Sequence, residues 1–100
     1  MPEHPLKIYE SLDPQLLAMV NDNQALALNE GALPRKIKLL MAMMLDAVNG
    51  APNGVASLAR LAIQAGATPA EIAESLRVAQ FVCGVGCVYT AAQALKDIIQ

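Results

Sequence analysis

Signals that start and stop helices recur along this chain at short intervals, and they constrain its fold more than any other feature. Asp13-Pro14 combines an N-capping residue with a proline at the first helical position. Thr68-Pro69-Ala70-Glu71 has the form of a capping box, in which the Thr hydroxyl and the Glu carboxylate each bind a backbone N–H at the helix start. Gly50 and Gly66 follow apolar stretches, as expected of glycine just after a helix. These signals predict a series of short helices.

Between the signals, apolar residues recur every three or four positions, which is typical of helices with one buried face. Gly84 and Gly86 interrupt the last apolar stretch and predict either a break or a very close helix crossing. Residues 52–54 form either a tight connection or the first turn of a helix. No strand-like alternation occurs. The sequence predicts an all-α domain of about five main helices, over residues 14 to about 29, 34–48, 52–65, 69–83 and most of 87–99.

The N-terminus lacks these signals. The first ten residues contain two prolines and no helical period, so we expect residues 1–11 to form an N-terminal arm that is mobile or laid on a neighbour. Residues 12–100 form one domain. This N-terminus also lacks the basic and apolar regions of a signal peptide, and we expect a cytoplasmic location.

Composition points to an assembly of subunits. The apolar fraction is 55% and the charged fraction 16%, against roughly 45–50% and 25% in ordinary soluble domains. A domain of 100 residues cannot hide that much apolar surface, so we expect a homo-oligomer. The net charge of −2 and seven scattered Lys and Arg residues exclude a nucleic-acid role. The longest apolar run, Val78–Ala92, is interrupted by Gln80, two glycines and Thr90, so no membrane span is expected.

Three landmarks occur in one order along the chain: Leu33-Pro34-Arg35-Lys36, Gly50-Ala51-Pro52, and Ala65-Gly66-Ala67-Thr68-Pro69-Ala70-Glu71-Ile72. In this layout the chain resembles the carboxymuconolactone decarboxylase and alkyl hydroperoxidase D-like family over about residues 12–98. The resemblance implies a compact helical domain that assembles as a trimer or a hexamer. No cofactor and no metal ion are expected.

The resemblance also shows which groups are missing. The redox-active branch of the family carries a Cys-x-x-Cys pair followed by a His, with a Glu on the preceding helix as proton relay. The two Cys positions correspond to Ala51 and Gly54, the His position to Leu58, and the Glu position to Leu39. Because only a thiolate attacks peroxide or disulfide, peroxidase chemistry through that dithiol is excluded. The sequence predicts a degenerate active site.

Decarboxylase chemistry lacks a proton donor. That branch of the family also has His at the position of Leu58. Decarboxylation of a lactone acid needs a proton donor for the developing carbanion and cations for the carboxylates. Arg35 and Arg60 could anchor carboxylates, and both are also typical of solvated surface residues. His4, the only histidine, lies between two prolines in the predicted arm and is expected to be exposed, with a role as a ligand or acid across an interface as the alternative.

Cys83 and Cys87 are the remaining candidates for chemistry. At i and i+4 on a continuous helix their side chains would share one face, about 6 Å apart along the axis. Two thiolates without a nearby His, Asp or Glu do not complete a zinc site, and both residues lie in the most apolar run, as packed free thiols do. Packing is therefore the first interpretation. A redox pair and a metal site shared between subunits are the alternatives.

Three functions remain open. In the first, the chain is a small-molecule-binding or structural oligomer that holds a small carboxylate or apolar ligand in an apolar pocket at a subunit interface, near Arg35, Leu39 and Leu58. In the second, it is a decarboxylase of a small lactone carboxylate that uses Arg35, Arg60 and an unidentified acid. In the third, it is a thiol redox protein that uses Cys83 and Cys87.

Overall fold

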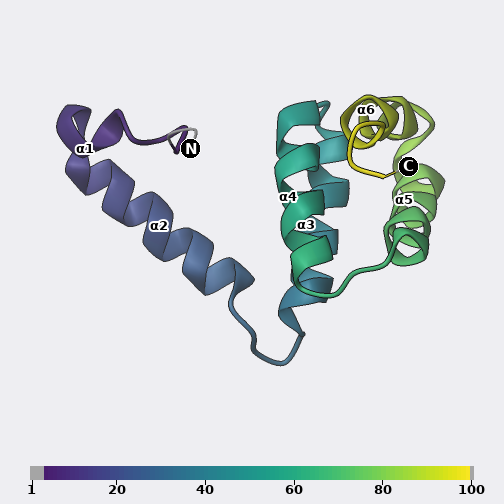
Figure 1. Ribbon diagram of the computed structural model, residues 1–100, viewed down its shortest axis with the longest axis horizontal. Coiled ribbons are helices and arrows are strands. Elements are labelled where there is room, and N and C mark those ends of the chain that lie inside the picture. Colours follow the sequence, from purple (N-terminus) through teal and green to yellow (C-terminus); the bar gives the residue numbers. More distant parts are fainter. Residues whose placement is uncertain (1–3, 100) are drawn as a thin grey trace.

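Most helices of this protein begin or end where capping or glycine signals occur in its sequence. The computed structural model describes residues 4–99, and that range contains helices and no strand (Figure 1). The all-α prediction is confirmed. The five predicted helices correspond to α2–α6, and α1 is an additional single turn. Within the described range the helices are α1 (Tyr9–Leu12), α2 (Pro14–Leu28), α3 (Arg35–Val48), α4 (Pro52–Gln64), α5 (Pro69–Cys83) and α6 (Gly86–Leu95).

Both predicted caps are formed. The Asp13 carboxylate accepts a hydrogen bond from the Leu16 N–H at 3.0 Å and so caps α2. At the start of α5 the Thr68 hydroxyl accepts from the Glu71 N–H at 3.1 Å, and the Glu71 carboxylate accepts from the Thr68 N–H at 2.9 Å. This reciprocal pair satisfies two N–H groups that would otherwise lack helical partners. Pro52 begins α4, so residues 52–54 are the first turn of that helix.

The two glycines near the C-terminus break the chain into separate helices. Gly84 has φ 91°, a left-handed conformation that strongly favours glycine, and it ends α5. Cys83 is therefore the last residue of α5, whereas Cys87 lies in the first turn of α6. Of the two alternatives predicted for Gly84 and Gly86, a break or a very close helix crossing, the structure shows the break. The two cysteines therefore do not share one face of a continuous helix.

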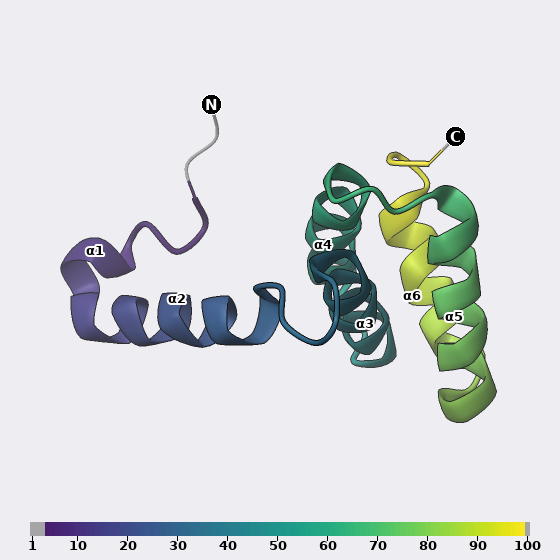
Figure 2. The ribbon, with the colours of Figure 1, turned by 90° about the horizontal axis from the view of Figure 1, so that it is seen from below.

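Helices α3–α6, together with the C-terminal turn, form what we call the body (residues 35–99). α3 and α4 lie side by side, and α5 and α6 lie together on one side of that pair (Figure 2). The largest fully buried side chains are Leu39, Met43, Val55 and Ile72. The other buried positions are mostly alanine, which lets the helices approach closely. Within residues 4–99 no polar or charged residue is buried, so the core of the body is hydrocarbon and one thiol.

Helices α1 and α2 form what we call the extension (residues 9–28). It projects away from the body in both views, and neither of its helices buries a side chain (Figures 1 and 2). The radius of gyration is 14.4 Å, against about 13 Å for a compact domain of this length. The part that stands apart from the body thus includes α2 as well as much of the predicted arm at residues 1–11, of which residues 1–3 lie outside the described range.

Two cations of α3 hold the end of the extension. Arg35 Nη1 donates to the Leu28 carbonyl at 3.5 Å, and Lys38 Nζ donates to the Asn29 carbonyl at 2.8 Å. Positive charge at a helix C-terminus is favourable, because the last carbonyls lack helical partners and carry partial negative charge. Both contacts lie where the extension joins the body. In the described part of the chain, no helix is both long and apolar enough to cross a bilayer.

Candidate functional site

The four positions that correspond to the redox residues of the family lie on α3 and at the start of α4. Leu39 lies on α3 and has 0% of its surface exposed. Ala51 is the N-cap of α4, Gly54 lies in its first turn, and Leu58 is one turn further on, partly buried against the core. None of these side chains is a nucleophile, an acid or a base. The start of α4 could lower the pKa of a cysteine thiol, but neither Ala51 nor Gly54 carries a thiol.

A carboxylate from α3 lies beside Gly54 instead. A Cβ added at Gly54 would lie 2.8 Å from Asp46 Cγ, and closer still to Asp46 Oδ2. The Asp46 side chain thus occupies the space that a cysteine at position 54 would need. A negative charge beside the first turn of α4 is favourable, since helix N-termini are partially positive. Glycine at position 54 is what allows Asp46 to lie there.

Asp46 is the one ionisable group near these positions that the sequence interpretation missed. It lies seven residues after Leu39, two helical turns along the same face of α3. The seven-residue spacing between Leu39 and Asp46 was visible in the sequence. Because the residues around Asp46 are mostly leucine and methionine, the sequence predicted only an apolar helix face there and indicated no role for Asp46. Asp46 is partly exposed, so its packing against Gly54 leaves it access to solvent.

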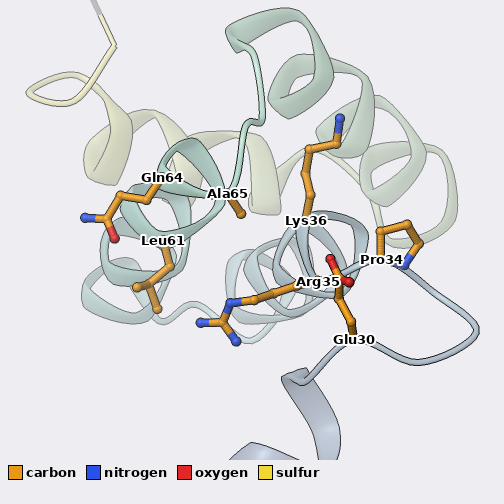
Figure 3. A pocket seen from close by; sticks show the side chains of 7 residues that line it. All are labelled: Glu30, Pro34, Arg35, Lys36, Leu61, Gln64 and Ala65. Atoms are coloured by element: carbon orange, nitrogen blue, oxygen red, sulfur yellow. The ribbon is translucent and has the colours of Figure 1, made fainter.

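A cavity of about 550 Å³ opens between the start of α3 and the end of α4 (Figure 3). Arg35 contributes the largest polar side chain, and Leu61 an apolar wall. Gln64 adds an amide that can donate and accept hydrogen bonds. The volume falls in the range of small-molecule sites. The lining residues are Glu30, Pro34, Arg35, Lys36, Leu61, Gln64 and Ala65.

The two cations of this cavity differ in what they contact. Lys36 Nζ lies 2.9 Å from Glu71 Oε2, so its charge is paired. Across residues 4–99 no carboxylate lies within ion-pair distance of Arg35, whose recorded bond is the long one to the Leu28 carbonyl. In Figure 3 the Arg35 side chain extends away from Pro34 and toward Leu61. The Arg35 guanidinium is therefore the group with unused capacity to bind an anion.

Glu71 takes part in two sets of bonds, one to Lys36 of α3 and one within the N-terminal cap of α5. The hydrogen bond from Lys36 lowers the pKa of the Glu71 carboxyl below its ordinary value, and the backbone N–H of Thr68 lowers it further. Partial burial acts in the opposite direction and is outweighed. The carboxylate serves the cap of α5 and the pair with Lys36 at once. It is a structural link beside the cavity rather than a free acid.

The other predicted ligand-binding residues do not converge on Arg35. Leu39 is inside the core, Leu58 packs at its edge, and neither lines the cavity that contains Arg35. Arg60 is exposed on α4 and also lies outside that lining. His4 is exposed near the N-terminus, where its Nδ1 accepts from the Leu6 N–H at 3.1 Å. The structure brings Arg35 together with Leu61 and Gln64, two residues that the sequence did not single out.

The two cysteines occupy different environments. Cys83 is exposed at the end of α5, whereas Cys87 is buried and donates through Sγ to the Gly84 carbonyl at 3.2 Å. Both are free thiols. In the described range, no group of three or more His, Cys, Asp or Glu side chains is placed to hold a metal ion. Of the two cysteines, only Cys87 is packed inside the protein, as the first interpretation expected. Cys83 is accessible to a reagent or to a partner.

The fold and these positions place the chain in a family. The family model of the carboxymuconolactone decarboxylase family matches residues 14–97, from the start of α2 to just past the end of α6. The chain belongs to the carboxymuconolactone decarboxylase family, as its three sequence landmarks predicted. No curated protein and no solved structure matches it.

Proposed function

We propose that this chain is an oligomeric member of its family that binds a small carboxylate without dithiol chemistry, at the cavity beside Arg35. The observation that carries the proposal is the Arg35 guanidinium, which lines a cavity of about 550 Å³ with no carboxylate partner in residues 4–99. Guanidinium groups bind carboxylates through two parallel hydrogen bonds. The positions of the family's redox groups hold hydrocarbon and glycine, which supports a binding role over a redox one.

The lining of the cavity narrows the ligand further. Leu61 and the ring of Pro34 suit an apolar portion, such as an aromatic or lactone ring. Glu30 opposes a second negative charge and can accept a hydrogen bond from a hydroxyl or amine of the ligand. Since Lys36 is already paired with Glu71, only one cation is free for the ligand. A monocarboxylate that carries a hydrogen-bond donor fits these groups best.

The oligomer is part of the same proposal. Among the described residues, many large apolar side chains are exposed, including Leu26 at 82% and Phe81 at 86%. A lone copy in water would leave this surface solvated, and association would bury it. Trimers and hexamers are the assemblies implied by the family resemblance. A cytoplasmic location also belongs to this proposal, and the free thiol of Cys83 is consistent with a reducing compartment.

A thermal-shift screen of aromatic and lactone carboxylates tests the ligand site. A ligand present at about ten times its Kd stabilises the folded state by about 1.4 kcal/mol, which raises Tm by roughly 6–11 °C in a domain of this size. We expect this shift in the wild type, its loss in Arg35→Gln, and its retention in Arg60→Gln. The Arg60 variant is the matched control, because it removes an exposed arginine that does not line the cavity.

Two results would reject the site. If no carboxylate stabilises the wild type while the protein remains folded, the binding proposal fails. If Arg60→Gln abolishes the shift and Arg35→Gln does not, the ligand binds elsewhere. Neutral amides of the same compounds should give no shift, since the proposed anchor recognises negative charge. The mass of the native protein in light scattering is measured in parallel, and a value of 10.5 kDa at micromolar concentration would reject the oligomer.

A further inference from the structure

The extension presents an apolar stripe that nothing within residues 4–99 covers. Leu16, Met19, Val20 and Leu26 are all exposed on α2, and their spacings of three, four and seven put them on one side of the helix. Asp22 is the single charged residue of this 15-residue helix. A helix of this length is marginal in water by itself, and most helices in proteins are stabilised by packing. The stripe therefore requires a partner surface.

A second uncovered apolar surface lies at the other side of the molecule. We call it the α5–α6 face; it surrounds the turn between these helices. Phe81 is 86% exposed and Tyr89 74%, although both are aromatic. A groove of about 340 Å³ lined by Leu76, Val88 and the stem of Arg77 adjoins it. The residues of the α5–α6 face are Phe81, Val82, Val85, Val88 and Tyr89. Val78 lies outside this face, because it lines a separate hollow with Ile37 and Leu40.

The extension and the α5–α6 face do not meet within one copy. Figures 1 and 2 both place α1 and α2 on the opposite side of the α3–α4 pair from α5. Where α2 joins the body, Arg35 donates to the Leu28 carbonyl and Lys38 to the Asn29 carbonyl. Each chain thus carries one projecting apolar helix and one apolar face with a groove, at separate places. Two copies can satisfy both surfaces together.

The exposed area agrees with such an exchange. The accessible surface is 6886 Å², whereas a compact monomer of 10.5 kDa exposes about 5,400 Å². The excess of about 1,500 Å² is larger than the ~800 Å² that each partner buries in a standard stable interface. Docking of the extension therefore has enough surface to hold an assembly together.

We propose that the extension of one copy docks on the α5–α6 face of a second copy, with Met19 and Leu26 against the aromatic residues and the adjoining groove. The inference rests on the oligomer proposed above and names the contact that forms it. The two surfaces are different parts of one chain. The contact closes either as a reciprocal exchange between two copies or as a ring of several.

The experiment uses the full chain and two variants that each damage one surface. Leu26→Asp places a charge in the stripe of the extension, and Phe81→Asp places one in the α5–α6 face. Both side chains are exposed, so both variants should fold, and circular dichroism checks this. Leu45→Asp is the matched control, because Leu45 is an exposed apolar residue of α3 that belongs to neither surface. We expect light scattering to show a reduced mass for the first two variants and the wild-type mass for the control.

Mixing the two damaged variants gives the decisive result. The intact extension of Phe81→Asp can dock on the intact face of Leu26→Asp, so a mixture should form a pair of twice 10.5 kDa although each variant alone is monomeric. An interface made by either surface with itself cannot recover in this way. Failure of the mixture to associate overturns the proposal. A wild-type mass in Leu26→Asp overturns it too, while leaving the oligomer and the carboxylate site standing.

Cys83 provides a second readout on the same samples. It is exposed next to Val82 of the α5–α6 face, and Cys87 is buried and serves as the internal reference. We expect a thiol reagent to label Cys83 at least tenfold more slowly in the wild-type assembly than in Leu26→Asp. Equal labelling rates in an assembled wild type would mean that another surface forms the interface.

Discussion

The body and the extension both carry apolar helical stripes, yet only the body uses them within one chain. In the body, Leu39 and Met43 of α3 meet Val55 of α4 and Ile72 of α5, and all four are fully buried. In the extension, Leu26 is exposed to 82% and no side chain is buried. An apolar stripe therefore predicts a helix in both regions, but it predicts burial only where another stripe lies opposite. Four experiments test how the body and the extension are stabilised.

The largest contrast is expected between two leucines. Leu39→Ala removes a fully buried side chain and should cost about 2–5 kcal/mol of unfolding free energy, through lost burial and the cavity left behind. Leu26→Ala should cost less than about 0.5 kcal/mol, because the side chain is already solvated in one copy. Urea unfolding at the lowest measurable protein concentration checks both. Equal costs there would mean that the extension is packed in the monomer.

Gly54 and Asp46 should show strong coupling inside the body. Gly54→Ala brings a methyl group against the Asp46 carboxylate and should destabilise the protein by about 1–2 kcal/mol. In an Asp46→Ala background the same change should stabilise it by about 0.5–1 kcal/mol, since alanine is the better helix former. A double-mutant cycle measured by urea unfolding tests this reversal of sign. Additive effects would show that Asp46 does not fill the space beside Gly54.

Removing the two capping residues should affect the body and the extension differently, with smaller losses of stability than the changes above. Thr68→Ala removes the cap of α5 and should lower the stability of the body by about 1 kcal/mol. Asp13→Ala removes the equivalent bond at α2, where fraying is local. We expect it to reduce helical content and speed proteolysis of the extension, with the thermal midpoint of the body unchanged. A lowered midpoint in Asp13→Ala would show that both regions unfold as one unit.

The smallest effect is a pH dependence carried by Glu71. Its pKa is lowered in the folded protein, mainly by the hydrogen bond from Lys36 and then by the Thr68 N–H. The unfolded chain therefore takes up the proton first as pH falls. The contribution of Glu71 to folding stability is complete above its pKa in the unfolded chain, about 4.3. This contribution is lost as pH falls through the lower pKa of Glu71 in the folded protein. Stability measured from pH 6 to 3 should fall less steeply in Glu71→Gln than in wild type. Glu74→Gln, one turn away on the exposed side of α5, should follow the wild type.

Local signals were sufficient to predict helices α2–α5, whereas the single turn of α1 (Tyr9–Leu12) overlaps the predicted arm and was missed. Asp13 and Thr68 caps require only a short side chain and the next three residues, so their bonds could be predicted from the sequence. The family landmarks, including the start of α3 at Arg35, were also legible, and the family is confirmed. The separation of Cys83 from Cys87 was open, because a glycine permits the left-handed conformation at Gly84 without requiring it.

The candidate site was less predictable, because it depends on distances between helices. Arg35 was expected beside Leu39 and Leu58, yet its cavity is formed with Leu61 and Gln64 at the far end of α4. A shift of one to two helical turns along α4, from Leu58 to Leu61 and Gln64, was enough to change the partners. Asp46 escaped notice because its role depends on the missing side chain of Gly54 on another helix. Neither relation is encoded in the spacing of residues along one segment.

The sequence by itself determined the helices, their caps, the family, and the loss of the redox groups at Leu39, Ala51, Gly54 and Leu58. These depend on side-chain identity and on interactions within one or two helical turns. Only the tertiary structure decided that α2 projects from the body, that Asp46 lies beside Gly54, and that Arg35 faces a cavity. Each of these depends on how the helices are placed in space. The apolar pattern of a single helix does not determine that placement, because the same pattern can be buried against many different apolar surfaces.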